Sequence, residues 1–187
     1  MNEVNRVMTL KNVLTIVDQR FISSTYLYFN DFACIQFIFN RKKIKMKEIR
    51  TEIIINSKPE KVWDILTDFE KHPEWNPFIK SISGNKKVGE QLIVKIQPPD
   101  GGGMTFKPLI LKFEQNREFR WIGKLLFKGI FDGEHYFKLT DNNNGTTTFV
   151  HGEKFGGILV GFLGKTLEKT KSGFQLMNEA LKEECEK

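Results

Sequence analysis

The sequence is poor in cysteine, and this excludes two kinds of site. Only two cysteines occur among its 187 residues, Cys34 and Cys185. They lie far apart, so the chain has neither a disulfide framework nor a Cys-x-x-Cys metal knuckle. We therefore expect a reducing, cytoplasmic setting. Cys185 stands among Glu183, Glu184 and Glu186, which disfavours a reactive thiolate.

The motifs of several familiar catalysts are also missing. No Ser-His-Asp arrangement occurs, and no recognised metal spacing is present. The glycine-rich stretch Pro98–Gly103 is followed neither by Lys-Ser/Thr nor by the start of a helix, which argues against a phosphate-binding loop. We expect no cofactor and no metal.

The charge gives no support for nucleic-acid binding. The formal net charge is +6, but residues 1–46 contribute +4 of it and residues 47–187 only +2. A nucleic-acid site needs basic residues gathered on one face. By contrast, phenylalanine is abundant, with 17 residues against 3 Trp and 3 Tyr. Such a composition is typical of a packed core or of an apolar pocket.

Residues 1–46 are set apart from the rest of the chain. The aromatic stretch 21–40 is interrupted by Asn30 and Asp31, which argues against a membrane span. Its basic cluster RKKIK follows the stretch, whereas a signal peptide carries its charge before it. Two interpretations stay open: a surface- or membrane-touching amphipathic segment, or upstream sequence that is not native, with Met46 as the natural start. We expect 1–46 to be a poorly ordered extension and 47–187 the folded domain.

Residues 47–187 read as strands between helices. Pro59 marks a helix start, and Val62, Trp63 and Leu66 then form one apolar face. A second short helix precedes Trp75-Asn76-Pro77-Phe78. Strands are predicted at Glu48–Ile55, Phe78–Ser83, Glu90–Gln97, Met104–Glu114, Glu118–Leu126, Phe127–Leu139 and Thr146–Phe155.

A long amphipathic helix of about 25 residues is predicted at the end of the chain. Its apolar stripe is Val160, Leu163, Leu167, Thr170, Phe174, Met177, Leu181 and Cys185. The fold class is therefore α+β: a curved antiparallel β-sheet wrapped around a long C-terminal helix, with two short helices after the first strand. The helix needs an apolar partner, and a cavity is expected between the helix and the sheet.

These features together resemble the SRPBCC superfamily, which groups START, pollen-allergen and polyketide cyclase/dehydratase-like proteins of the helix-grip fold. The resemblance covers residues 47–187. It rests on Pro59, Val62, Trp63 and Leu66, on the Trp75-Asn76-Pro77-Phe78 box, on Gly133-Glu134-His135, and on Gly145-Thr146-Thr147 leading to His151, Glu153, Phe155 and Gly156.

The resemblance implies that an internal cavity binds or carries a hydrophobic small molecule, such as a lipid or a polyketide-like compound. Two alternatives stay open. One is an enzyme of the cyclase/dehydratase type, and the other is an interaction or stress-related protein without a ligand. Fold alone does not decide among them. We expect no nucleic-acid partner and no stable membrane span, and the sequence does not indicate an oligomeric state.

The candidate site lies on the last hairpin. If the loop Asp141–Gly145 closes symmetrically, the paired residues are Leu139 with Thr147, Phe137 with Phe149, His135 with His151, and Gly133 with Glu153. These side chains would share the cavity face. The predicted ligand contacts are Phe78, His135, Phe137, Phe149, His151, Glu153, Phe155 and Leu163. In an enzyme His135 and His151 would do acid/base work; alternatively the cluster is a polar patch that fixes strand register.

Overall fold

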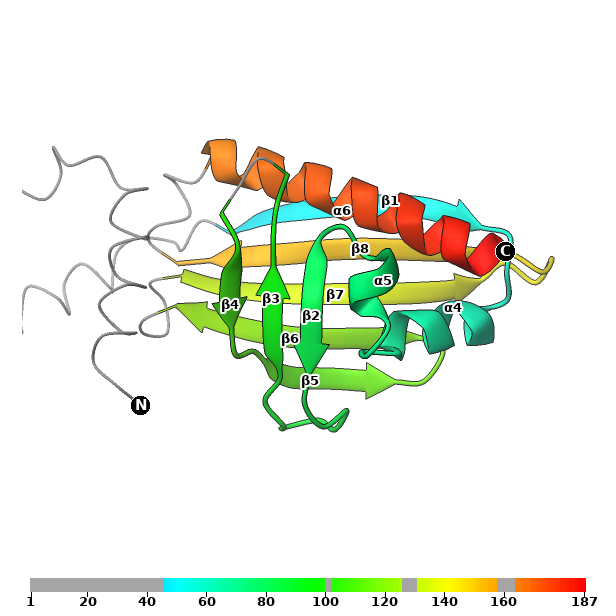
Figure 1. The fold of residues 1–187 in the computed structure, drawn as a ribbon, viewed down its shortest axis with the longest axis horizontal. Helices are drawn as coiled ribbons and strands as arrows, with labels where there is room; N and C mark the ends of the chain where they lie inside the picture. Colours follow the sequence, from blue (N-terminus) through cyan, green and yellow to red (C-terminus); the bar gives the residue numbers. More distant parts are fainter. Residues whose placement is uncertain (1–45, 100–101, 126–130, 158–163) are drawn as a thin grey trace, which may run out of the picture. The chain divides into compact units, whose positions relative to one another are not determined.

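The computed structural model describes residues 46–99, 102–125, 131–157 and 164–187. The elements in chain order are β1 (Lys47–Ile55), α4 (Pro59–Thr67), α5 (His72–Trp75), β2 (Ile79–Ser83), β3 (Ile93–Ile96), β4 (Met104–Phe106), β5 (Leu109–Glu114), β6 (Glu118–Leu125), β7 (Phe131–Asp141), β8 (Thr147–Gly156) and α6 (Gly164–Glu186) (Figure 1). The predicted α+β order is confirmed. Among the described residues, no helix is both long and apolar enough to cross a bilayer.

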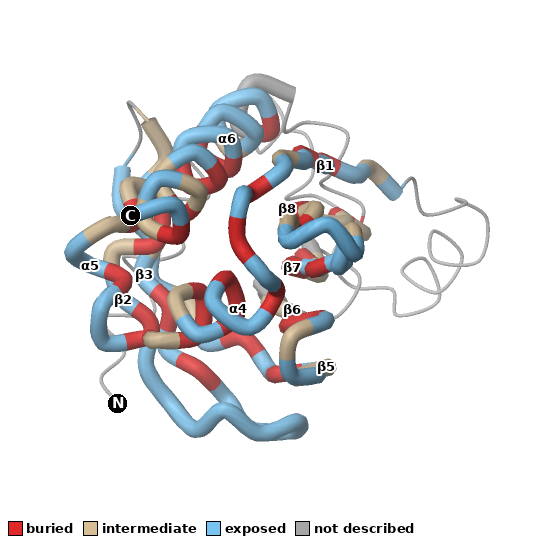
Figure 2. The backbone as a smooth tube through the Cα atoms, turned by 90° about the vertical axis from the view of Figure 1, so that its right-hand side faces the viewer, coloured by how far each residue is buried: buried red, intermediate tan, exposed pale blue. Residues whose placement is uncertain are grey.

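The strands form two antiparallel sheets. The larger has the order β1-β8-β7-β6-β5, and the smaller has the order β2-β3-β4. Figure 1 shows the small sheet lying across the large one, with α6 running along the β1 side. Figure 2 shows that the buried residues turn towards the space between the two sheets, α4 and α6. This arrangement is the helix-grip architecture that the sequence predicted.

The predicted single strand Met104–Glu114 is divided in the structure. β4 ends at Phe106 and belongs to the small sheet, whereas β5 begins at Leu109 and belongs to the large one. Pro108 stands between them and has no N–H to donate, so it interrupts a continuous ladder. Its carbonyl accepts a hydrogen bond from the N–H of Leu92 at 2.9 Å. The chain therefore passes from one sheet to the other at this proline.

The predicted pairing of β7 with β8 was wrong by two residues. The structure pairs Leu139 with Phe149, Phe137 with His151, His135 with Glu153, and Gly133 with Phe155. The reason is the loop, which spans 142–146 rather than 141–145. Asn143 and Gly145 adopt left-handed φ values of 58° and 85°, and the N–H of Asn142 bonds the carbonyl of Thr146 at 3.1 Å. A shift of two residues leaves every side chain on its predicted face.

The two longer helices pack through their predicted apolar faces. In α4, Val62, Trp63 and Leu66 are buried. The described part of the α6 stripe buries Leu167, Phe174, Met177, Leu181 and Cys185, and burial raises the pKa of the Cys185 thiol to about 12. Val160 and Leu163 of the predicted stripe lie outside the described residues. Both helices thus close the core over the sheets.

Asn76 organises the corner between α5 and β2. Its Oδ1 accepts hydrogen bonds from the N–H groups of Phe78 (2.9 Å) and Ile79 (2.8 Å). Its Nδ2 donates to Nδ1 of His72 at 3.1 Å, so Nε2 of His72 donates to the carbonyl of Leu66 at 2.7 Å. Burial lowers the pKa of His72 below its usual value. The Trp75-Asn76-Pro77-Phe78 box thus has a structural role: it fixes the connection between α5 and β2.

Replacing Asn76 by alanine is expected to lower the free energy of unfolding by about 2–3 kcal/mol, because two backbone N–H groups and a histidine nitrogen lose their partners in a buried place. Urea unfolding measures this difference. Asn85→Ala, at an exposed position of the β2–β3 connection, is the matched control and should cost less than about 0.5 kcal/mol. Equal losses in the two variants would contradict the role of Asn76.

Candidate functional site

Two histidines meet on the inner side of the large sheet. His135 lies on β7 and His151 on β8, and both are buried. Their Nε2 atoms are 3.0 Å apart, a hydrogen-bond distance. In the observed register each histidine is opposite another residue, so the two rings approach diagonally. The predicted meeting of these side chains is therefore observed, although they are not directly paired.

A chain of hydrogen bonds fixes which ring nitrogens carry hydrogen. Oγ1 of Thr51 donates to the carbonyl of His151 (3.1 Å) and accepts from Nδ2 of Asn178 (3.0 Å). The Asn178 Oδ1 therefore faces Nδ1 of His151 at 3.0 Å, and that nitrogen is the donor. The other nitrogen of His151 then accepts from Nε2–H of His135. Nδ1 of His135 is left with a lone pair.

Glu153 stands at the end of this chain. Its Oε2 is 3.5 Å from Nδ1 of His135, and 19% of its side chain is exposed. Burial raises the pKa of Glu153 to about 8, so at neutral pH it is mostly a neutral carboxylic acid. A neutral carboxyl can donate its hydrogen to the lone pair of His135, whereas a carboxylate would be repelled by it. Because Asn178 cannot take up a proton, a proton can enter or leave this series of hydrogen bonds only at Glu153.

Aromatic side chains cover both histidine rings. The indole of Trp121 stacks on His135 with ring centroids 4.6 Å apart and planes within 4°. The Phe174 ring, from α6, stacks on His151 at 3.8 Å and 17°. His135 is 4% exposed and His151 is fully buried. A substrate atom therefore has no direct access to either ring in this structure.

Burial also keeps both histidines neutral. It lowers the pKa of His135 to about 3. The pKa of His151 lies well below its usual value, first because the ring is buried and second because His135 is adjacent. Within the described part of the chain, no group of three His, Cys, Asp or Glu side chains is placed to hold a metal ion. The ionisable group of the cluster that titrates near neutral pH is Glu153.

The other predicted contact residues belong to the same core. Phe78 packs edge-on against Phe174, with centroids 5.4 Å apart, and lies over Gly173. Phe137, Phe149 and Phe155 are buried on the inner face of the sheet. The remaining predicted contact, Leu163, lies outside the described residues. The structure therefore brings the predicted phenylalanines and histidines together as one packed wall.

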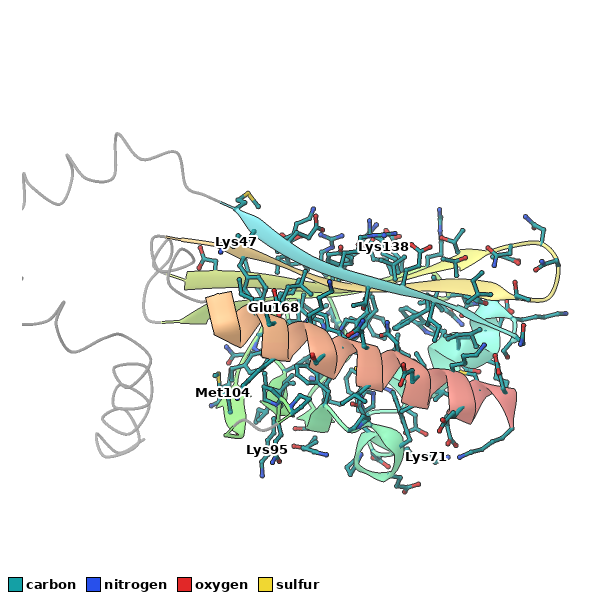
Figure 3. The ribbon with its side chains drawn as sticks, turned by 90° about the horizontal axis from the view of Figure 1, so that it is seen from above. Lys47, Lys71, Lys95, Met104, Lys138 and Glu168 are labelled. Carbon is teal, nitrogen blue, oxygen red and sulfur yellow. The ribbon has the colours of Figure 1, made fainter. Side chains whose placement is uncertain are left out.

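The wall is less completely covered at the end that carries Glu153. Ile96 and Met104 pair with each other on the face of the small sheet that turns inward with Ile79 and Val94. Yet Ile96 is only partly buried, and Met104 is 50% exposed. Figure 3 shows Met104 on the small sheet, across α6 from the large sheet. This end of the core, which we call the open end, is apolar and accessible.

Two glycines form the floor of the open end. Gly123 and Gly133 are paired on β6 and β7. A side chain at Gly133 would collide with the carboxyl of Glu153, and one at Gly123 would touch the ring of Phe106 at 3.5 Å. Glu153 and Phe106 therefore lie directly against the sheet because these positions have no side chain. The same two glycines place a carboxyl beside inward-facing apolar residues.

A separate surface pocket of about 410 Å³ lies among α4, α5 and the end of α6. It is lined by Asp64, Ile65, Asp68, Lys71, Glu74, Trp75, Glu184 and Lys187. Six of these eight residues are charged, and none belongs to the predicted contact set. A lining of this kind suits water and small ions better than an apolar molecule.

The sequence prediction missed four residues of the cluster: Thr51, Trp121, Phe174 as a contact, and Asn178. Phe174 was expected in the helix stripe, and Asn178 follows it by four residues, which places an amide within an apolar stripe. A polar residue at such a position signals a buried partner. Thr51 also signals a buried polar partner, because it stands between Ile49 and Ile53 on the inner face of β1.

The fold is similar to those of several solved structures. Protein MLL2253 from Mesorhizobium loti is 21% identical, with 73% of this chain and 95% of that chain covered and a TM-score of 0.55. A START superfamily protein from Mycobacterium smegmatis is 19% identical (74% and 97% covered, TM-score 0.54). The Zhui aromatase/cyclase from Streptomyces sp. R1128 is 12% identical (76% and 94% covered, TM-score 0.60). At these identities the likeness concerns the fold alone.

No curated protein matches the chain. The sequence profile of one family does, over residues 46–186, and this family is described as polyketide cyclase / dehydrase and lipid transport. The match spans the whole folded unit that carries the histidine–glutamate cluster. The chain therefore belongs to the polyketide cyclase/dehydrase and lipid transport family.

Proposed function

We propose that the domain binds a hydrophobic small molecule at its open end, with the Glu153 carboxyl as the polar contact. The observation that carries this proposal is the coincidence of two features. Inward-facing Ile96 and Met104 are incompletely covered, and the partly exposed carboxyl of Glu153 belongs to the same inner layer. An apolar lining with few polar groups is the usual form of a small-molecule site.

The chemistry of Glu153 narrows the class of ligand. A neutral carboxyl both donates and accepts hydrogen bonds, so it suits a hydroxyl or carbonyl oxygen on an otherwise apolar molecule. Lipids and polyketide-like compounds have this character. The family description, which includes lipid transport and polyketide cyclisation, supports the same class. The phenylalanine wall around His151 would contribute shape and rigidity, since its side chains already contact one another.

Ile96→Asp is expected to weaken binding of a fluorescent apolar probe at least tenfold, because a charge in the open end would have to lose water when the probe enters. Thr105→Asp is the matched control. Thr105 is exposed, lies next to Met104 and is opposite Lys95 on the outer face of the small sheet, so this variant should leave probe affinity within about twofold. Fluorescence titration measures both, and native mass spectrometry of the purified full chain identifies any co-purified ligand.

Repeated preparations without a bound molecule, together with no probe binding, would contradict the proposal. They would favour the interpretation of an interaction protein whose interior is only a core. Equal loss in the two aspartate variants would instead show that the probe binds elsewhere. Thermal melting of each variant confirms that it remains folded.

An enzyme of the cyclase/dehydratase type is the second candidate, and one observation favours it. The pKa of Glu153 is raised to about 8, close to the pH at which a general acid or base is most effective. In this version Glu153 would exchange its proton with the substrate, and Nδ1 of His135 would orient the neutral carboxyl by accepting its hydrogen bond. Once a substrate is known, Glu153→Gln should abolish turnover but retain binding; unchanged turnover would exclude this role.

A further inference from the structure

Apolar side chains face solvent where the two sheets join. Val88, Ile93, Leu109 and Leu111 are 55%, 47%, 38% and 38% exposed. They make up half of the large hydrophobic residues that are exposed in the described part of the chain. None of them contributes to the core cluster. Packing of the fold therefore does not explain why these positions are apolar.

The backbone brings these side chains onto one surface. Gln91 is bridged to Leu109, and the N–H of Ile110 bonds the carbonyl of Glu90 at 2.9 Å, so the segment before β3 runs alongside β5. Leu92 and Ile110 point inward and are buried. Their neighbours Ile93 and Leu109 therefore point outward, because side chains alternate along a strand. A strand with one face on the core usually has polar residues on the other.

Lysines are frequent in the segments that carry this apolar surface. Five lie between residues 79 and 111: Lys80, Lys86, Lys87, Lys95 and Lys107. Among the described residues of that segment the only acid is Glu90. None of the five forms an ion pair with another described residue, whereas Lys112, just beyond them, is held by Glu114 and Glu118. Figure 3 shows Lys95 on the side of the small sheet that faces away from the large sheet.

We propose that this surface, which we call the seam surface (Val88, Ile93, Lys95, Lys107, Leu109 and Leu111), docks on an anionic lipid bilayer. Exposed aliphatic side chains can enter the boundary between headgroups and acyl chains, and lysines around them attract anionic headgroups. Each lysine near such a membrane strengthens binding by about fivefold. The charge of the seam surface is complementary to that partner.

The residue types favour a lipid over a protein partner. Protein interfaces are enriched in Tyr, Trp and Arg and depleted in Lys. The seam surface has only aliphatic residues and lysines, and no aromatic residue or arginine. Figure 2 shows β5, which carries Leu109 and Leu111, on the opposite side of the core from α6. Docking would therefore leave the histidine cluster and its α6 cover undisturbed.

The test is co-sedimentation of the full chain with vesicles. One set contains phosphatidylcholine and phosphatidylglycerol in equal parts, and the other contains phosphatidylcholine alone. We expect binding to the anionic vesicles that weakens as salt is raised. Two double variants, Ile93→Ser with Leu109→Ser and Lys95→Glu with Lys107→Glu, should each bind at least about twentyfold more weakly. Their melting temperatures should stay close to wild type, because these side chains are already exposed.

Matched controls separate the seam surface from other parts of the chain. Leu176→Ser, on the exposed side of α6, should bind within about twofold of wild type. So should Lys58→Glu with Lys61→Glu, at the N-cap and in the first turn of α4. Lys42→Glu with Lys43→Glu tests the basic cluster that precedes the domain, and it too should retain binding.

Three results would overturn the proposal. The first is no binding of wild type to anionic vesicles at low salt. The second is undiminished binding by both seam variants, with loss confined to the Lys42/Lys43 variant. The third is binding of polyglutamate, in place of vesicles, through the seam lysines, which would indicate an acidic protein partner. The readout needs no bound ligand, so it is independent of the proposed small-molecule site.

Discussion

Replacing Phe174 by alanine is expected to lower the free energy of unfolding by about 3–5 kcal/mol. The side chain is fully buried. It stacks on His151 at 3.8 Å and touches His135 and Phe78 edge-on at 5.1 and 5.4 Å. Its removal would therefore open a cavity beside two neutral polar rings. Equilibrium unfolding in urea measures the loss.

Two further variants make this prediction specific. Phe174→Leu retains an apolar cover and should cost only about 1–2 kcal/mol. Leu176→Ala, at an exposed position two residues along the same helix, should cost less than about 0.5 kcal/mol. If Phe174→Ala were no more harmful than Leu176→Ala, α6 would not be the cover of the histidine cluster.

Glu153→Gln is expected to change how stability depends on pH. The pKa of Glu153 is about 8 in the folded protein, against an ordinary 4.5. Between these values the folded protein holds a proton that the unfolded chain has lost. The contribution of this group is therefore fully present below pH 4.5 and is lost as pH rises through 8. Glutamine is also uncharged but cannot titrate, so it lacks this dependence.

The difference in unfolding free energy between wild type and Glu153→Gln should thus fall by about 4 kcal/mol from pH 5 to pH 9. Denaturation of both proteins across this range measures it, and groups common to both cancel. Glu168→Gln, on the exposed side of α6, should follow the wild-type profile. A constant difference between wild type and Glu153→Gln would show that Glu153 is ionised throughout.

The buried histidines have the opposite effect on the pH dependence of stability. Burial lowers the pKa of His72, His135 and His151 below the ordinary 6.5. The unfolded chain therefore binds protons that the folded protein excludes as pH falls below 6.5. Their contribution is present above pH 6.5 and is lost in acid, by up to about 1.4 kcal/mol per histidine and pH unit. Wild type should accordingly be most stable near neutral pH.

The sequence predicted the faces of the strands better than their partners. Which side chains share a face depends only on alternation, so His135, Phe137, His151 and Glu153 were grouped correctly. Their pairing depends on the conformation of a five-residue loop, and that is set by left-handed residues such as Asn143. Because the loop lies one residue later than predicted, the partner of each β7 residue differs by two residues from the prediction, while every side chain keeps its predicted face of the sheet.

Contacts between elements that are distant in the sequence could not be predicted from the sequence pattern. Asn178 and Thr51 are 127 residues apart and meet only when α6 lies on β1. Pro108 offered a local signal that the predicted strand Met104–Glu114 would break, because proline cannot donate to a ladder. The helix stripe was predicted well, since the period of 3.6 residues is a local property.

The position of β1 has a consequence for synthesis on the ribosome. Among the strands of the described residues its partner in the sheet is β8 alone, and Thr51 is 100 residues from His151. At translation rates of about 5–20 residues per second, the first strand waits on the order of 5–20 seconds for its partner. During that time its inner side chains, including Ile49 and Ile55, have no sheet to join. The nascent chain is therefore expected to depend on chaperones until β8 has emerged.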